Sequence, residues 1–123
     1  DKKYTLISDM NKVFIEAICL YLKIESKIYC SSNFQLLGKK SERLANICLQ
    51  AGATDYVSGP TAKDYIDMEA FKQRNINLEW FDYKDYRSYS QLWDEFTHKV
   101  SILDLLFNCG KNTPTYMKYL KKN

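Results

Sequence analysis

Hydrophobic residues near the start of the chain recur at intervals of three and four. The pattern begins after Ser8 and includes seven apolar positions: Met10, Val13, Phe14, Ala17, Ile18, Tyr21 and Leu22. This spacing places them on one face of a helix, and Ser8 or Asp9 can cap its N-terminus. Residues 4–7, just before the helix, predict a short strand.

The middle of the chain alternates short apolar runs with another helical pattern. Residues 27–30 predict a buried strand that opens into a polar loop, and residues 40–50 predict a helix that ends at Gly52. Residues 55–58 predict a second strand, which stops at Gly59-Pro60 because proline donates no ladder hydrogen bond. Strand, helix and strand in this order are typical of a right-handed parallel crossover.

The second half of the chain continues the alternation. Asp67 can cap a short helix through Arg74, with Met68 and Phe71 facing inward. Residues 76–81 alternate apolar and polar side chains and predict a third strand with two unlike faces. Further predicted helices are an apolar one over residues 100–108, ended by Gly110, and a basic tail helix within residues 111–123.

These elements predict an α/β fold with a small, mainly parallel sheet flanked by helices. A length of 123 residues suits one domain, so residues 1–123 are interpreted as a single α/β domain or a fragment of one. Because the chain starts abruptly at Asp1, we expect it to depend on a missing N-terminal half. The complete protein would then be a larger three-layer Rossmann-like fold with this chain as its C-terminal part.

The charge pattern argues against a dedicated nucleic-acid binder. The net charge is +3, but five lysines lie at the two ends: Lys2, Lys3, Lys118, Lys121 and Lys122. Removing these five from the 18 basic residues leaves 13 against 15 acidic residues, a balance of −2. A polyanion partner requires a clustered basic face, which this distribution does not predict.

The four cysteines predict neither disulfides nor structural zinc. They show no C-x-x-C spacing, and the sequence has one histidine as a possible co-ligand. No apolar stretch approaches the ~18 residues that span a bilayer, and no signal peptide is visible. We therefore expect a cytoplasmic location without membrane insertion, and no metal site.

Polar residues follow both predicted strands of the first crossover. Ser31 and Ser32 follow the first strand, whereas Ser58 and Gly59 end the second and precede Lys63 and Tyr65. In open α/β sheets, ligands bind beyond the carboxyl ends of parallel strands, and hydroxyl and N–H groups there suit phosphate or carboxylate. The alternative is that Gly59-Pro60 is only a turn and the serines satisfy nearby backbone groups.

Three cations near the start of the second predicted helix form another candidate anion site. Lys39, Lys40 and Arg43 lie where the helix dipole disfavours positive charge, and a bound phosphate would relieve that conflict. They can equally be solvated surface cations. The segment has neither a Walker loop nor a dinucleotide fingerprint, so no cofactor is identified.

Aromatic residues and one histidine complete the candidates. Tyr83, Tyr86 and Tyr89 recur at every third residue and either pack on the core or form a stacking wall. His98 could act as a general base, but no nucleophile motif accompanies it, and a surface position is the alternative. No catalytic residue is identified.

Two segments of the chain are familiar together: residues 53–67, ATDYVSGPTAKDYID, and residues 100–110, VSILDLLFNCG. With support from residues 8–11 and 38–44, the sequence resembles the C-terminal half of the WbqC-like protein family. Members begin with a proline- and aromatic-rich segment that this chain lacks. The polar positions that match the family pattern are candidates for a shared ligand site: Ser58, Gly59, Lys63, Tyr65, Asp104 and Asn108.

The resemblance implies a role in bacterial O-antigen and surface-polysaccharide biosynthesis. The expected function is a transferase-type protein acting on a nucleotide-linked or amino sugar. The alternative is a non-catalytic interaction module of a polysaccharide-biosynthesis assembly, with an exposed aromatic stretch from Tyr83 to Trp93. Asp104 and Asn108 lie four apart on one predicted helix face, where they either contact ligand or brace the helix.

Overall fold

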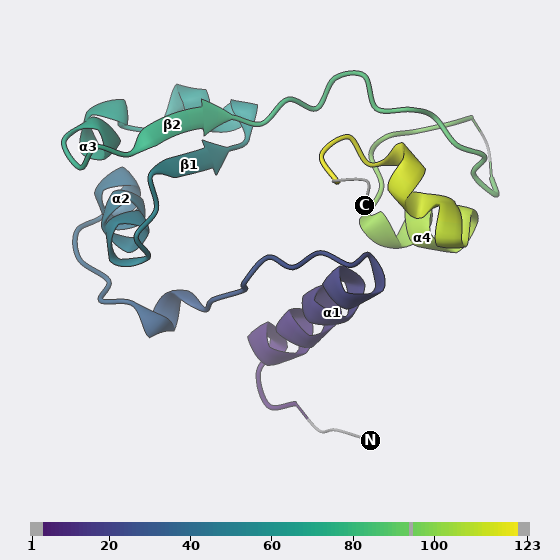
Figure 1. Cartoon of the computed structure of the whole chain (residues 1–123), viewed down its shortest axis with the longest axis horizontal. Helices are drawn as coiled ribbons and strands as arrows, with labels where there is room; N and C mark the ends of the chain where they lie inside the picture. Colours follow the sequence, from purple (N-terminus) through teal and green to yellow (C-terminus); the bar gives the residue numbers. More distant parts are fainter. Residues whose placement is uncertain (1–3, 94, 121–123) are drawn as a thin grey trace. The chain divides into compact units, whose positions relative to one another are not determined.

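A computed structural model describes residues 4–93 and 95–120 of the chain. The chain forms two compact units, one made of residues 1–28 with 85–123 and the other of residues 29–84. Within the described residues, the fold is mixed α/β, with four α-helices and a sheet of two parallel strands (Figure 1).

The unit of residues 29–84 is built around a parallel crossover. Helix α2 (Lys40–Gln50) precedes strand β1 (Asp55–Ser58), and helix α3 (Met68–Lys72) connects β1 to strand β2 (Asn77–Trp80). The two strands lie side by side in register, with Asp55 opposite Asn77 and Ser58 opposite Trp80 (Figure 1). The crossover therefore runs through α3, and not through residues 40–50 as the sequence analysis expected.

The core of this unit lies between the helices and one face of the sheet. Its buried residues come from α2, from α3 and from the position just before β2: Ala45, Cys48, Ala70, Phe71 and Ile76. Tyr56 on β1 stacks on Phe71 with ring centroids 4.9 Å apart. The alternation predicted for residues 76–81 is confirmed, since Leu78 and Trp80 are half-buried while Asn77 and Glu79 are exposed.

The helical ends follow the predicted signals in most places. Asp67 caps α3 by accepting a hydrogen bond from Glu69 N at 3.0 Å. Gly52 lies just beyond α2 with a φ of +69°, the left-handed conformation that glycine adopts without strain. Phe71 is buried as predicted, but Met68 is 63% exposed, so the prediction that it faces inward is wrong.

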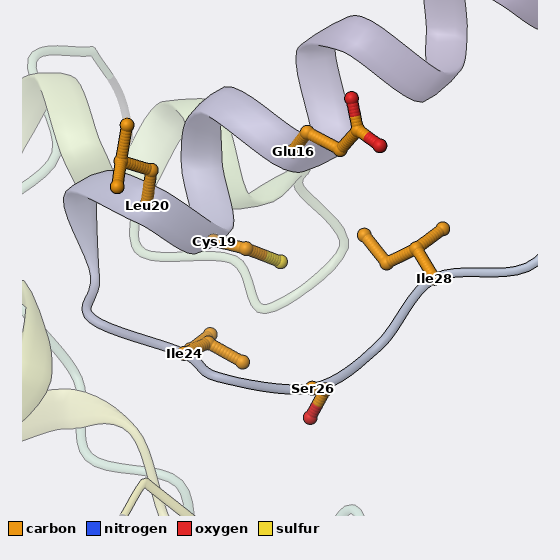
Figure 2. A pocket seen from close by; sticks show the side chains of 6 residues that line it. All are labelled: Glu16, Cys19, Leu20, Ile24, Ser26 and Ile28. Atoms are coloured by element: carbon orange, nitrogen blue, oxygen red, sulfur yellow. The ribbon is translucent and has the colours of Figure 1, made fainter.

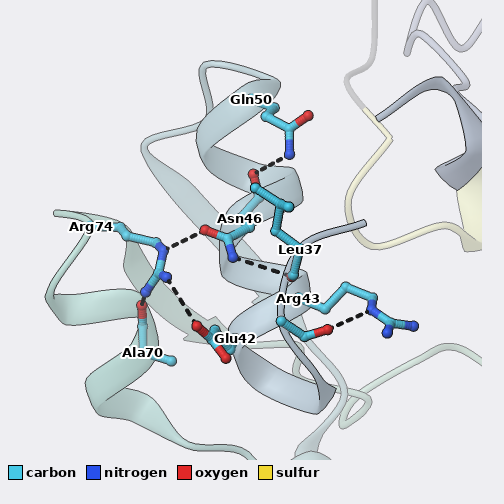
Figure 3. Close-up of polar contacts among 8 residues, drawn as sticks. Leu37, Glu42, Arg43, Asn46, Gln50, Ala70 and Arg74 are labelled. Atoms are coloured by element: carbon cyan, nitrogen blue, oxygen red, sulfur yellow. Dashed lines mark hydrogen bonds and ion pairs between the residues drawn. The ribbon is translucent and has the colours of Figure 1, made fainter. Parts of the chain in front are cut away.

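A polar network joins α2 to α3 and to the segment before α2 (Figure 3). Arg74 donates from Nε to Asn46 Oδ1 at 2.9 Å and from Nη1 to the Ala70 carbonyl at 2.7 Å. Asn46 donates to the Leu37 carbonyl at 3.2 Å, and Gln50 exchanges two hydrogen bonds with the backbone of Gln35. These bonds fix the position of α2, which is too short to be stable alone.

The other unit contains helix α1 (Ile7–Tyr21), helix α4 (Ile102–Cys109) and the 3-10 helix η3 (Gly110–Tyr116). Ser101 caps α4 by accepting from Leu103 N at 3.1 Å, and Gly110 ends the helix with a φ of +50°. Buried Thr113 on η3 donates to the Gly110 carbonyl at 2.7 Å. Of the tail helix predicted within 111–123, only the part up to Tyr116 is helical, as η3; residues 117–120 form no helix, and residues 121–123 lie outside the described residues.

Four local predictions for the first thirty residues are wrong. Residues 4–7 form no strand, because α1 begins at Ile7 with Leu6 as its N-cap and without a side-chain cap from Ser8 or Asp9. Residues 27–30 form no strand either, since they pair with no neighbour and Cys30 N donates to Asn33 Oδ1 at 3.0 Å. Cys30 is also exposed, so it does not lie in a buried run.

Candidate functional site

The strongest candidate site lies at the carboxyl ends of the two parallel strands. Ser58 is the last residue of β1 and pairs with Trp80, the last residue of β2. Gly59 follows, and a 3-10 helix, η2 (Pro60–Asp64), leads away from the sheet. Because parallel strands end at the same edge, the groups that follow β1 and β2 gather there.

A cation and two aromatic rings line this edge. Lys63 on η2 is exposed, and its Nζ lies 5.4 Å from the centroid of the Trp80 ring, within the range of a cation–π contact. Tyr83 follows β2, is 63% exposed and packs on Phe81 with ring centroids 4.9 Å apart. We call Ser58, Gly59, Lys63, Trp80 and Tyr83 the strand-end cluster.

Neither the backbone conformation at Gly59 nor the space around it requires a glycine. Its φ of −68° is accessible to any residue. A Cβ added there would lie 3.6 Å from the Tyr83 hydroxyl, an ordinary van der Waals contact. A small side chain would therefore fit between the end of β1 and this hydroxyl. Tyr65, 73% exposed, lies just beyond η2.

The start of α2 is connected to the segment that follows η2. Ser41 is buried, and its Oγ accepts a hydrogen bond from Asp67 N at 2.9 Å. This bond brings the backbone beside Lys39 and Lys40 close to residues 65–67. The Arg43 side chain makes a local hydrogen bond, in which its Nε donates to the Gly38 carbonyl at 3.1 Å (Figure 3).

Ser31 and Ser32 occupy a different setting from the one expected. They lie in the short 3-10 helix η1 (Ser31–Asn33), and both are exposed. Because residues 27–30 form no strand, these serines do not follow a strand end. Ser31 and Ser32 therefore lack the strand-end position for which they were predicted to bind a ligand.

Asp104 and Asn108 belong to the other compact unit and make local contacts there. The Asp104 carboxylate accepts from the Tyr89 hydroxyl at 2.6 Å and from Gln91 Nε2 at 3.0 Å. Gln91 also bonds both the N–H and the carbonyl of Thr97. Asn108 Nδ2 donates to the Asp104 carbonyl at 2.9 Å, one turn back along α4. These contacts match the bracing role that the sequence left open.

Tyr89 lies at the centre of an aromatic group, and one member of that group, Phe96, contacts His98. Its ring packs edge-on against Phe96 at 5.3 Å and Tyr116 at 5.7 Å, and Phe96 in turn meets His98 at 4.6 Å. Burial raises the pKa of the Tyr89 phenol, and the hydrogen bond to Asp104 adds to the increase. The folded unit therefore stabilises the protonated form of the Tyr89 phenol.

We expect this cluster to weaken at alkaline pH. A folded-state pKa above the ordinary tyrosine value of about 10 gives stability that is present below pH 10 and lost as the pH rises through the raised value. NMR of the Tyr89 ring should show a titration midpoint above 10. In Asp104→Asn the midpoint should move partway back, because burial remains. Equal midpoints in both proteins would refute the role of Asp104.

Sequence reasoning missed Trp80, Ser41 and the position of Tyr83. Trp80 was assigned only to a strand face, because its partner strand was not known. The register places it opposite Ser58 and under Lys63. Ser41 follows two cations, and nothing in the sequence indicates that its hydroxyl binds a backbone group 26 residues away.

Neither a metal-binding cluster nor a membrane-spanning helix occurs among the described residues. No group of three or more His, Cys, Asp or Glu side chains within residues 4–93 and 95–120 is arranged to hold a metal ion. In the same part of the chain, every helix is too short or too polar to cross a membrane.

Comparison with known proteins identifies the family. The chain is 46% identical over 122 residues to a Mycobacterium tuberculosis (strain ATCC 25618 / H37Rv) protein described as "Uncharacterized protein Rv1507c". The match covers 99% of this chain and 53% of the relative, so the chain spans about half of that protein's length. No solved structure shows a significant match. Residues 1–116 match the WbqC-like protein family, and the chain belongs to that family.

Proposed function

We propose that this chain is part of a transferase-type protein of bacterial O-antigen and surface-polysaccharide biosynthesis, acting in the cytoplasm on a nucleotide-linked or amino sugar. The strand-end cluster carries this proposal. It combines a cation, a hydroxyl-bearing strand end, the half-buried ring of Trp80 and the exposed ring of Tyr83 within one unit of the chain. Sugars linked to phosphate offer an anion for the cation and a ring face for the aromatic groups.

Each group of the cluster has a role in this proposal. Ser58, through its hydroxyl, and Gly59, through the close approach it allows, hold an anionic group, and Lys63 neutralises it; Pro60 has no N–H, and the Ala62 N–H donates to the Gly59 carbonyl at 3.0 Å. Additional positive charge comes from Lys39, Lys40 and Arg43. The hydrogen bond from Asp67 N to Ser41 Oγ holds the start of α2, where they lie, next to the segment that follows η2. Tyr65 orients the acceptor, since its ring is 73% exposed just beyond the site. The residues of the site bind and position, and the proposal assigns no nucleophile.

The proposed function includes a larger fold. A sheet of two parallel strands is unusually small, since parallel strands usually belong to larger sheets that are covered on both faces. Among the described residues, each strand pairs on one side only. The relative extends well beyond the match. We therefore retain the proposal that the complete protein is a Rossmann-like fold with this chain as its C-terminal part.

A third layer over the outer sheet face would meet a largely polar surface. Asp55, Asn77 and Glu79 are exposed there, and hydrogen bonds from Thr54 and Asn77 lower the pKa of Asp55. A layer of the larger fold on this face would therefore supply hydrogen-bond partners to these side chains, with Val57, 53% exposed, as its apolar contact.

One observation favours the alternative function of a non-catalytic interaction module. Leu92 and Trp93 are 74% and 77% exposed, next to the Gln91 side chain that is bonded to Thr97. Exposed apolar side chains on a braced segment are typical of a protein contact. Tyr89, however, is half-buried in the aromatic group and contributes less to such a surface.

Calorimetric titration with nucleotide sugars and amino-sugar phosphates tests the proposal. Lys63→Met keeps an apolar stem against Trp80 but removes the charge, so we expect binding to weaken about tenfold. Lys72→Met, which removes an exposed lysine from α3, is the control and should bind like the wild type. Absence of binding by the wild type, or equal affinities for all three proteins, would favour the interaction module.

A further inference from the structure

Helix α1 carries an apolar seam that is exposed along its length. Its members alternate at intervals of three and four residues: Ile7, Met10, Phe14, Ala17 and Tyr21. This is the spacing by which one helix packs on another element. All five residues are exposed, with Ile7 at 75% and Phe14 at 58%, and no residue of α1 is buried. The seam therefore lacks the contacts that its pattern specifies.

The chain that follows α1 returns along the other side of the helix. Residues from both segments line a shallow pocket there: Glu16, Cys19, Leu20, Ile24, Ser26 and Ile28 (Figure 2). At about 100° per residue, Glu16 and Cys19 lie more than a quarter-turn from the seam. Lys12 and Glu16 also form an ion pair on that side, at 3.7 Å. The returning segment thus leaves the seam open.

The positions that flank the seam indicate what kind of surface covers it. Val13, Ile18 and Leu20 are apolar where a two-stranded coiled coil usually carries charged residues, so the apolar face is broad. The helix has 15 residues, about two heptads, which is shorter than the three to four heptads of a stable coiled coil. Both features fit a helix inside a larger hydrophobic core better than a seam between two copies of the chain.

The relative supplies a candidate for that core. The match covers 53% of its length, so 47% of the protein lies outside the matched part. A polypeptide of that size is comparable to the present chain and large enough to bury a helix face.

We infer that the seam of α1 is the docking surface for the polypeptide that corresponds to this remaining 47% of the relative. The contact is apolar and involves Phe14 as its central residue. This inference rests on the larger fold in the proposed function, but it is independent of the sugar ligand. It names the surface through which the two parts of the family protein form one core.

Co-expression tests the inference. The 123-residue chain is produced with the tagged segment of the mycobacterial relative that lies outside the match. We expect a one-to-one complex by light scattering, with slower hydrogen exchange in α1 than in the chain alone. Phe14→Glu should weaken the complex at least about 100-fold, because a carboxylate would be buried without a partner. Ile15→Glu is the matched control, since Ile15 is 49% exposed but lies off the seam.

Four results would overturn the inference. They are failure of the wild-type chain to retain the segment, equal retention by Phe14→Glu, strong protection of α1 in the chain alone, and dimers of the chain that Phe14→Glu dissociates. The last result would identify a second copy as the occupant. Sugar binding is measured separately on the chain, so failure of the docking surface and failure of the sugar site are distinguishable.

Discussion

Replacing Phe71 with alanine is expected to unfold the unit of residues 29–84 or nearly so. Phe71 is fully buried, stacks on Tyr56 and is the largest side chain in a core of five buried residues. Truncation of a buried phenylalanine costs about 3–5 kcal/mol, and a core this small has few neighbours that can fill the cavity. Urea unfolding followed by circular dichroism would measure the loss.

Met68→Ala provides the matched comparison for Phe71. Met68 lies one turn earlier on the same helix but is 63% exposed, so its truncation should change the free energy of unfolding by less than about 1 kcal/mol. Similar losses for the two variants would mean that the core described for this unit is not the one that stabilises it.

Replacing Arg74 with methionine is expected to have the next largest effect. The Arg74 side chain is 20% exposed and donates to Asn46 on α2 and to the Ala70 carbonyl on α3. Methionine keeps much of the aliphatic volume but leaves these acceptors without their donor. We expect a loss of about 2 kcal/mol in the free energy of unfolding.

Arg43→Met is the control for Arg74. Arg43 is exposed and donates a hydrogen bond to the carbonyl of nearby Gly38, so its removal should cost less than about 0.5 kcal/mol. If Glu42, 3.9 Å from the Arg74 guanidinium and 58% exposed, contributed most of the effect, Glu42→Gln would match the loss in Arg74→Met. We expect Glu42→Gln to be nearly neutral.

Local signals predicted the α-helices of this chain well. The periodicity after Ser8, the cap at Asp67 and the glycine after α4 all mark elements that the structure contains. Such features depend on residues a few positions apart, so the sequence displays them directly. The family resemblance also proved correct, because it rested on contiguous segments that the match includes.

Long-range pairing is where sequence reasoning failed. Residues 27–30 look like a buried strand, but a strand needs a partner, and the ladder instead joins residues 55–58 to 77–80. That error moved the expected crossover and placed Ser31 and Ser32 at a strand end. Trp80 entered the candidate site for the converse reason, since only the register brings it opposite Ser58.

The most direct test of the proposed site uses the fluorescence of Trp80. The chain has two tryptophans, so Trp93→Phe leaves Trp80 as the reporter beside Lys63. Titration with a hexosamine 1-phosphate should change its emission saturably, and Lys63→Met should weaken that response about tenfold. An emission unchanged by millimolar ligand, or a response that Lys63→Met does not weaken, would contradict a sugar-phosphate site at the ends of β1 and β2.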